Sequence, residues 1–336
     1  MNMDGFQQIQ GVLMNKIKST LPANLSLADE LADLLQVSSD SAYRRIRCET
    51  ALTIEEIFLI CQHFNISFDS LTSVKSGCVS FNYNEVKTTN DMIRYLVAIK
   101  EDMIRINKSP ERHITYTAVD MPIFHYFKFP EYFYFKMFYW LRSVANDPAL
   151  QLKKFRVSDL SPEIRDICMQ LADLYAFVPS TEVWSDSILA SVLKQFTFYW
   201  QLGLFESQED AFRLIEAVKK TLQMVEHQAE LNMKLSVRGE SDNFSHNYQL
   251  YQSDIEIGTN YILVSVGSFK SLYSSFHTFN YMVTTSQEFC TLSENWMNNL
   301  IKQASLISGV GEKYRFQFFK KMYCQLDELT RMVEKD

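Results

Sequence analysis

Residues 26–71 read SLADELADLLQVSSDSAYRRIRCETALTIEEIFLICQHFNISFDSL, and the pattern of this stretch determines how the N-terminal part of the chain is interpreted. Ser26 is followed three residues later by Asp29, and Thr53 by Glu56, which is the spacing of side chains that cap a helix N-terminus. Between them, the run at positions 38–41 offers hydroxyl and carboxylate caps for another helix. Apolar residues recur at helical spacing behind each cap. The stretch therefore predicts three short helices, which begin near residues 26, 38 and 53.

The helix expected after residue 38 has two different faces. Ala42 and Ile46 lie four positions apart, so both should face the core. The opposite face then presents polar and charged side chains, and arginine on such a face can bind guanine or phosphate through two hydrogen bonds. Serine hydroxyls and free backbone N–H groups at the helix start can bind phosphate. We therefore expect DNA contacts from Ser38, Ser39, Asp40, Ser41, Tyr43, Arg44 and Arg47.

The same residues resemble the helix-turn-helix of phage repressor and Cro type regulators, the XRE family. In that pattern a helix containing Leu-Ala is followed by a tight turn, a small apolar residue and a recognition helix; here Leu31-Ala32, Val37 and Ser38–Arg47 occupy these places. Thr53, which opens the next helix, and the closing stretch Phe64–Leu71 match the tail of the motif. The resemblance implies a cytoplasmic, repressor-like bacterial transcription regulator that reads duplex DNA with the helix at residues 39–48.

The charge of this region limits how it can bind DNA. Residues 1–75 contain six basic and nine acidic residues, a net charge of −3, so non-specific attraction to phosphate is weak. We therefore expect a homodimer that places two recognition helices about 34 Å apart on an inverted-repeat operator. Two residues depart from the family pattern. Asp40 repels phosphate unless it accepts a hydrogen bond from cytosine, and Cys48-Glu49 replaces a glycine-containing helix end.

A second interpretation of the same helices remains open. They form a small bundle that docks a protein partner, with Arg44 and Arg47 as a solvated face. The chain is then a non-enzymatic interaction or scaffold protein, and any binding of nucleic acid lacks the steep salt dependence of phosphate contacts. A third interpretation, an enzyme with a regulatory head, requires a cleft of convergent titratable groups that the sequence does not reveal.

The remaining chain predicts a larger domain. With 9 Gly and 7 Pro in 336 residues, long helices are the natural expectation, and helical patterns recur from about residue 90 onward. The stretch from residue 109 to residue 122 is extended and turn-rich. Between residues 248 and 284, β-branched and aromatic runs are separated by Gly and Asn, which indicates an antiparallel meander. Its expected strands are Tyr248–Tyr251, Ile255–Ile257, Tyr261–Val266 and Tyr281–Thr284.

The predicted fold is mainly α. It comprises a four- to five-helix helix-turn-helix domain at residues 1–75, a linker at 76–88, and a mostly helical α+β domain at 89–336 with a small antiparallel sheet near residues 248–284. The last domain is expected to dimerise or to sense an effector, either a ligand or a protein partner. Aromatic residues crowd into positions 124–140, which predicts either a core with a dimer interface or a pocket for an aromatic ligand.

Signals for catalysis or metal binding are thin. The six cysteines are scattered without zinc spacing, and neither a dinucleotide fingerprint nor a nucleophile elbow is present. Ser191 and Lys194 match a serine-x-x-lysine pattern only by chance. We therefore expect no enzyme activity, no catalytic residues, no cofactor and no metal. The first ten residues lack a signal peptide pattern, and charges interrupt the apolar stretch Met121–Trp140, so a soluble cytoplasmic protein without membrane contact is expected.

Overall fold

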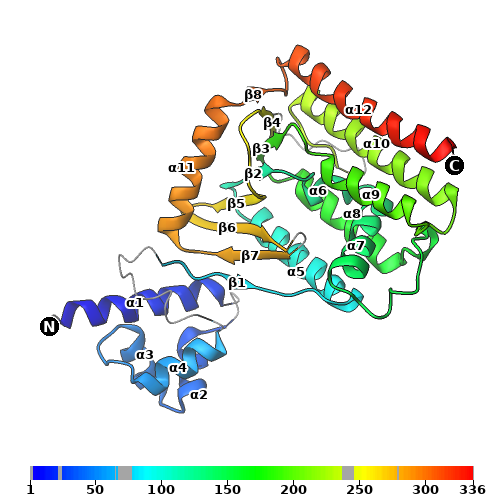
Figure 1. The fold of residues 1–336 in the computed structure, drawn as a ribbon. Coiled ribbons are helices and arrows are strands. Elements are labelled where there is room, and N and C mark those ends of the chain that lie inside the picture. Colours follow the sequence, from blue (N-terminus) through cyan, green and yellow to red (C-terminus); the bar gives the residue numbers. More distant parts are fainter. Residues whose placement is uncertain are drawn as a thin grey trace. The chain divides into compact units, whose positions relative to one another are not determined.

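The structure, a computed structural model, describes residues 3–21, 25–64, 66, 78–236, 246–277 and 280–335. The chain divides into two compact units, residues 1–80 and residues 81–336 (Figure 1). Across the described part of the chain, no helix has the length and apolar character needed to cross a membrane.

The first unit contains four helices within its described residues. Their predicted caps are present: Ser26 accepts a hydrogen bond from the Asp29 N–H, Ser38 caps the next helix, and Thr53 forms a capping box with Glu56. The predicted starts of three helices are therefore confirmed. The bounds are α1 Met3–Thr20, α2 Leu27–Leu35, α3 Ser39–Ile46 and α4 Ile54–His63.

One face of each helix supplies the core of the first unit. Ala42 is fully buried and Ile46 packs against the same core, so the predicted inner face of α3 is confirmed. The closing turn expected at Phe64–Leu71 lies, apart from Phe64 and Ile66, outside the described residues. The buried apolar residues of this core are Leu13, Met14, Ile17, Leu31, Ala32, Ala42, Leu52, Ile60 and Ile66.

The second unit is built on an eight-stranded mixed sheet, which corrects the mostly helical domain with a small antiparallel sheet that the sequence predicts. The strand order is β1-β7-β6-β5-β2-β3-β4-β8. β3 runs parallel to both β2 and β4, and the other neighbours are antiparallel. The strands are β1 Asn82–Tyr83, β2 Arg112–Ala118, β3 Ser180–Ser185, β4 Tyr248–Ser253, β5 Tyr261–Val266, β6 Phe269–Phe276, β7 Asn280–Thr284 and β8 Ser305–Leu306.

The sequence does not reveal this sheet because its central parallel strands lack an alternating pattern. Parallel strands are covered on both faces, so their residues need not alternate between apolar and polar. All six residues of β3 are buried, yet three of them are Ser or Thr and one is Glu. β2 lies in the stretch expected to be extended and turn-rich, and β6 lies between two expected strands. Ile255–Ile257, expected as a strand, follows β4 without pairing.

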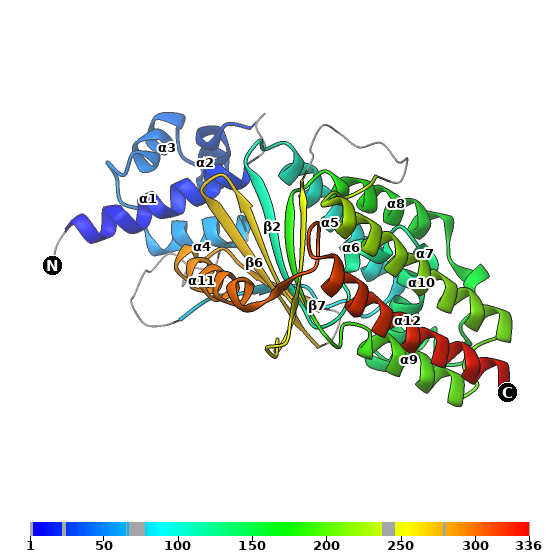
Figure 2. The same ribbon diagram turned by 90° about the horizontal axis from the view of Figure 1, so that it is seen from above.

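Helices cover both faces of the sheet (Figure 2). α11, Gln287–Gln303, packs against β4, β5 and β6 on one face. Two short turns follow α7 (Pro130–Tyr139) in the chain: the π-helical turn η2, Trp140–Val144, and the 3-10 turn η3, Val157–Asp159. The opposite face carries α5 Thr89–Asn107, α6 Ile123–Tyr126, α7 Pro130–Tyr139, α8 Pro162–Ala176, α9 Ala190–Gln201, α10 Gln208–Leu231 and α12 Glu312–Lys335.

Aromatic side chains fill much of the core of the second unit. Phe127, Phe133 and Phe135 are fully buried, and the ring of Phe135 contacts the rings of Phe155 and Phe205. Aromatic pairs in such offset or edge-on arrangements add to the stabilisation that burial alone provides. The expectation that residues 124–140 contribute to a core is therefore confirmed.

Candidate nucleic-acid interface

A turn of three residues joins α2 to α3. Gln36 ends α2 with a φ of 53°, in the left-handed region, and its N–H donates to carbonyl groups of the last turn. The Val37 N–H donates to Ala32 O at 3.0 Å, and its side chain packs against the core. Ser38 then caps α3 by accepting a hydrogen bond from the Ser41 N–H at 3.3 Å. The two helices are therefore joined by a tight turn in which each residue has a defined capping or packing role.

The outer side of α3 presents the residues that the sequence predicts to contact DNA. The Arg44 and Arg47 side chains are 57% and 59% exposed, and Tyr43 is 51% exposed. Ser41 is the exception, because it is half-buried and its carbonyl accepts a hydrogen bond from Arg45 Nη1 at 3.3 Å. The remaining predicted residues lie exposed at the start of the helix, and they are Ser38, Ser39 and Asp40.

α3 ends two residues before the predicted boundary. Ile46 is its last residue and Arg47 is its C-cap. Cys48 follows with a φ of 59°, a left-handed conformation that glycine adopts more readily than any other residue. The next N–H, that of Glu49, donates to Arg44 O at 2.9 Å. The helix therefore ends in a tight reversal built on a cysteine, which turns Glu49 back toward the helix.

Arg45 holds α3 to α4 from the inner side of the helix. Its Nη2 and Nε donate to Glu56 Oε1 at 2.7 and 3.1 Å, and both side chains are 15% exposed. Burial raises the pKa of Glu56, but hydrogen bonds from Arg45 and from the Thr53 N–H, with the arginine charge, outweigh burial and lower it. The sequence indicates Glu56 as a cap but not its second role as the partner of Arg45.

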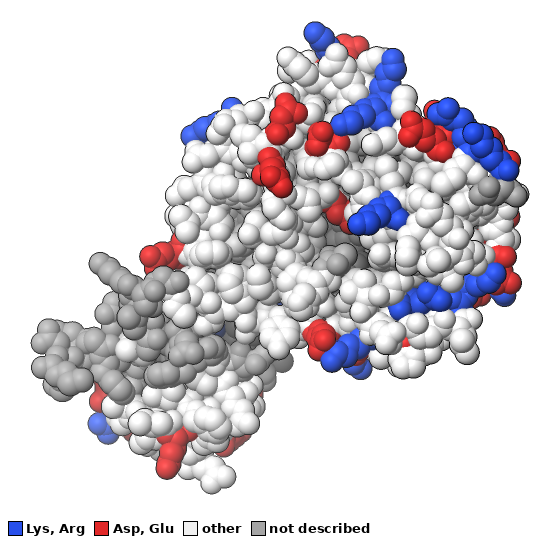
Figure 3. Space-filling view, in the orientation of Figure 1, with Lys and Arg blue, Asp and Glu red and all other residues white. Residues whose placement is uncertain are grey.

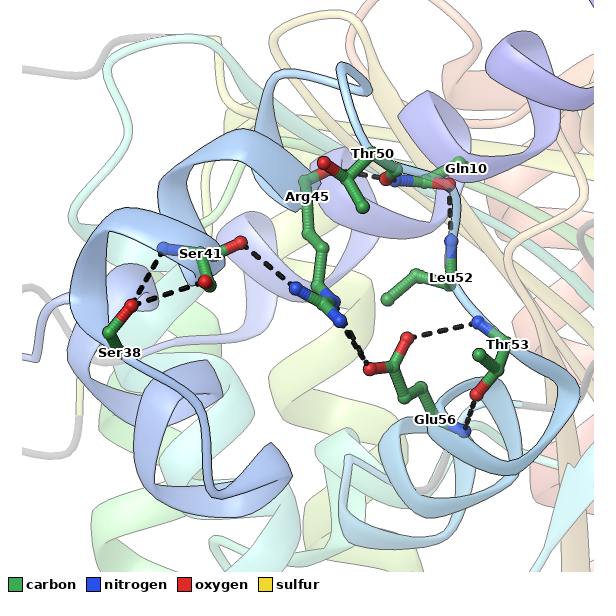
Figure 4. A network of polar contacts seen from close by, with 8 residues as sticks. All are labelled: Gln10, Ser38, Ser41, Arg45, Thr50, Leu52, Thr53 and Glu56. Carbon is green, nitrogen blue, oxygen red and sulfur yellow. Dashed lines mark hydrogen bonds and ion pairs between the residues drawn. The ribbon is translucent and has the colours of Figure 1, made fainter.

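Gln10 of α1 fixes the loop between α3 and α4 (Figure 4). Its Nε2 donates to Arg45 O at 2.8 Å and to Thr50 O at 2.9 Å, and its Oε1 accepts from the Leu52 N–H at 3.1 Å. These bonds satisfy Thr50 O and the Leu52 N–H in the loop, and they add a second partner to Arg45 O, which also accepts from the Cys48 N–H at 3.0 Å. Gln10 is not among the residues that the sequence indicates. The available signal was a polar residue on the apolar stripe of α1, three positions before Leu13.

Both exposed arginines of α3 face the carboxylate of Glu49. Arg47 Nε lies 3.1 Å from Glu49 Oε1, and Arg44 Nε lies 3.9 Å from Glu49 Oε2. Solvent screens ion pairs this exposed, so they add little to stability. On the face of the second unit that Figure 3 shows, basic side chains lie among acidic ones rather than in a continuous basic surface. The outer side of α3, with Arg44 and Arg47, is our candidate for DNA contact.

A buried polar cluster lies inside the second unit, where sequence reasoning did not expect one. Glu182 of β3 is fully buried and receives hydrogen bonds from Trp184 Nε1 at 2.8 Å and from Tyr248 Oη at 3.3 Å. His125 Nε2 lies 2.7 Å from the same carboxylate. Burial raises the pKa of Glu182, but the charge and hydrogen bond of His125, together with the other partners, outweigh it and lower the pKa.

Lys234 completes this cluster. Its Nζ donates to Val178 O and to Ser180 Oγ, and it lies 3.6 Å from the centre of the Tyr175 ring. Burial lowers the pKa of Lys234 to about 7, although the nearby charge of Glu182 opposes this shift. The adjoining cavity measures about 10 Å³, room for about one water molecule. The cluster is a hydrogen-bonded part of the core of the second unit.

Two further hollows in the second unit differ in size. One is a cavity of about 20 Å³ whose lining includes Tyr126, Tyr139 and Trp140. In this conformation it holds about one water molecule, which is too little room for the expected aromatic ligand. A groove of about 460 Å³ lies between η3 and α10, with Phe129 and Phe212 among its lining residues. Its volume falls in the range of small-molecule sites. The described residues contain no group of three or more His, Cys, Asp or Glu suited to a metal.

Comparison with known proteins gives no match to this chain, whether with protein-family models, with curated protein sequences or with solved structures. The interpretation of α3 therefore depends on its own geometry and on the sequence resemblance described above.

Proposed function

We propose that the first unit binds duplex DNA with sequence specificity through the outer side of α3, and that the chain is a cytoplasmic transcription regulator. One observation carries this proposal. α2, the left-handed turn at Gln36 and α3 follow one another without a loop, and α3 buries Ala42 while Tyr43, Arg44 and Arg47 point to solvent. This arrangement supports a helix-turn-helix with a recognition helix free to enter a groove.

The dimensions and chemistry of α3 suit the major groove. A helix with its side chains is about 10–12 Å across, and the major groove of B-DNA is about 12 Å wide. Arg44 and Arg47 lie three positions apart, so both guanidinium groups face the same side and can bind guanine or phosphate. At the helix start, the exposed Ser38 and Ser39 provide hydroxyl groups for phosphate.

The second unit is proposed to dimerise the chain and to sense an effector. A dimer doubles the number of phosphate contacts, which compensates for the net charge of −3 over residues 1–75. The groove between η3 and α10 supports the sensing role, since it is large enough for a small molecule. The proposal is a homodimer on an inverted-repeat operator.

A second candidate function, docking of a protein partner by the first unit, is favoured by a different observation. Ile54 and Phe58 lie four positions apart on α4 and are 86% and 63% exposed. Large apolar side chains exposed side by side are typical of protein contacts. Salt dependence separates the two functions, because phosphate contacts weaken steeply with salt and apolar contacts do not.

Binding of the full chain to labelled random-sequence duplexes of about 30 bp, followed by fluorescence anisotropy between about 50 and 200 mM salt, tests the proposal. Replacing Arg44 and Arg47 together by alanine should weaken binding at least about tenfold and reduce the salt slope by about two. The matched control replaces Arg94 and Arg105 by alanine, since both are exposed on α5 and paired with carboxylates. Equal losses in the two double variants would contradict the proposal.

A further inference from the structure

We infer that Glu49 is an intramolecular competitor of DNA phosphate, which occupies Arg44 and Arg47 in the free protein and thereby lowers non-specific DNA binding. This inference rests on the proposed function of α3. It assigns a role in limiting non-specific binding to a residue whose carboxylate repels phosphate.

Backbone hydrogen bonds fix the position of Glu49. The left-handed Cys48 reverses the chain at the end of α3, and the N–H groups of Glu49 and Thr50 then donate to Arg44 O at 2.9 and 3.3 Å. These two bonds fix the position of Glu49 against the last turn of α3. The side chain therefore starts from a point beside the exposed arginines.

The contacts of Glu49 imitate those of a phosphate. Arg47 reaches it with two groups, Nε at 3.1 Å from Oε1 and Nη2 at 3.4 Å from Oε2. This two-point contact is the geometry with which arginine binds either a carboxylate or a phosphate. Arg44 Nε lies 3.9 Å from Oε2 of the same group. A DNA phosphate must therefore displace Glu49 before it can bind these arginines in the same way.

Arg44 and Arg45 of α3 and Arg47 at its C-cap all have a carboxylate partner. Arg45 is held by Glu56 in the half-buried pair between α3 and α4, while Arg44 and Arg47 share Glu49. The pair with Glu56 is part of the fold, whereas the contacts with Glu49 are exposed and exchangeable. DNA binding through Arg44 and Arg47 therefore requires that phosphate replace Glu49 as their partner.

Such an exchange costs the same free energy on any DNA, but its consequence is largest for non-specific DNA. Non-specific binding depends almost entirely on phosphate contacts, so replacing one anionic partner by another gains little. A cognate site adds base contacts in the major groove, and these contacts contribute binding energy that offsets the loss of the contacts with Glu49. The competitor therefore weakens binding to any duplex, and it limits retention of the chain on arbitrary sequence, where no base contacts offset its cost.

The test compares Glu49→Gln with Glu55→Gln in the full chain. Both variants remove one negative charge from the first unit, but Glu55 is exposed on α4 and has no ion pair among the described residues. The backbone bonds of residue 49 persist in the variant, and circular dichroism verifies the fold. Affinity is measured by anisotropy on random-sequence duplexes of about 30 bp over a series of salt concentrations.

We expect Glu49→Gln to bind random duplex about three- to fivefold more tightly than the unmodified chain. The salt slope should change by about one or less, because the same arginines contact phosphate in both complexes. Glu55→Gln should gain about twofold or less, the effect of net charge alone. Equal affinities of the two variants, with binding still dependent on Arg44 and Arg47, would overturn the role of Glu49 while leaving the proposed function intact. Absence of duplex binding by every folded form would overturn both.

Discussion

Replacing Gln10 by leucine tests whether one side chain of α1 fixes the loop that carries the end of α3. Leucine is similar in size and apolar, so it keeps the packing of the helix but makes no hydrogen bonds. The change removes the side-chain partner of Thr50 O and of the Leu52 N–H, and it leaves Arg45 O with the Cys48 N–H alone. We expect the first unit to lose stability and the loop to open more often.

The expected magnitude follows from the burial of these groups. The bond to the Leu52 N–H is buried, and an unsatisfied buried group costs about 1–3 kcal/mol. The other two bonds are part-buried, and each loses a hydrogen bond worth about 0.5–1.5 kcal/mol, less what water restores. The free energy of unfolding of the first unit should therefore fall by about 2–4 kcal/mol.

Hydrogen–deuterium exchange detected by mass spectrometry is the suitable assay. All four tryptophans belong to the second unit, so fluorescence does not report on the first. Peptides covering residues 45–53 should exchange much faster in Gln10→Leu than in the unmodified chain, by about 30-fold or more if opening is 2 kcal/mol easier. The matched control is Gln7→Leu, because Gln7 is exposed on the same helix.

Equal exchange in the two variants would refute the reasoning. It would mean that water replaces the bonds of Gln10 without cost, and that the loop is held by other contacts.

The remaining predictions concern one turn and one buried cation. Gln36→Gly should raise the free energy of unfolding of the first unit by about 0.5–1 kcal/mol, because glycine relieves the left-handed conformation at the end of α2; slower exchange in α2 and α3 checks this, and unchanged exchange contradicts it. The pKa of Lys234 is about 7 in the folded protein and about 10 in the unfolded chain. Between these two values the unfolded chain holds a proton on Lys234 that the folded protein has lost, so the free energy of unfolding rises with pH. Lys234→Met should remove a rise of about 1–3 kcal/mol between about pH 7.5 and 9.5, measured by urea unfolding with tryptophan fluorescence, and equal slopes in both proteins would refute the assignment.

The helices of the first unit could be predicted from the sequence because their signals are local. Ser26 with Asp29 and Thr53 with Glu56 act within one helical turn, and the inner face of α3 follows from residues four apart. Gln10 and Arg45 could not be predicted in this way because their partners are distant in sequence. Gln10 bonds residues 35 to 42 positions away, and no spacing rule connects them.

The sheet of the second unit was predicted wrongly for a related reason. Pairing of β2 with β3 joins residues more than 60 positions apart, and parallel pairing has no local turn to signal it. β3 also reads as polar, because Ser180, Thr181 and Glu182 are buried with hydrogen-bond partners rather than apolar packing. These partners are the side chains of Tyr175, His113 and Trp184, respectively. A buried carboxylate with several donors can be recognised only once the fold has brought them together.

The most direct test of the central claim is selection of bound sequences from a library of random duplex DNA by the full chain. The account predicts enrichment of an inverted repeat whose half-sites lie one helical turn, or a multiple of it, apart. Enrichment should disappear when Arg44 and Arg47 are both replaced by alanine and persist when Arg94 and Arg105 are replaced. A folded chain that enriches no sequence, or one whose enriched sequence survives the loss of Arg44 and Arg47, would contradict the proposal that α3 reads DNA.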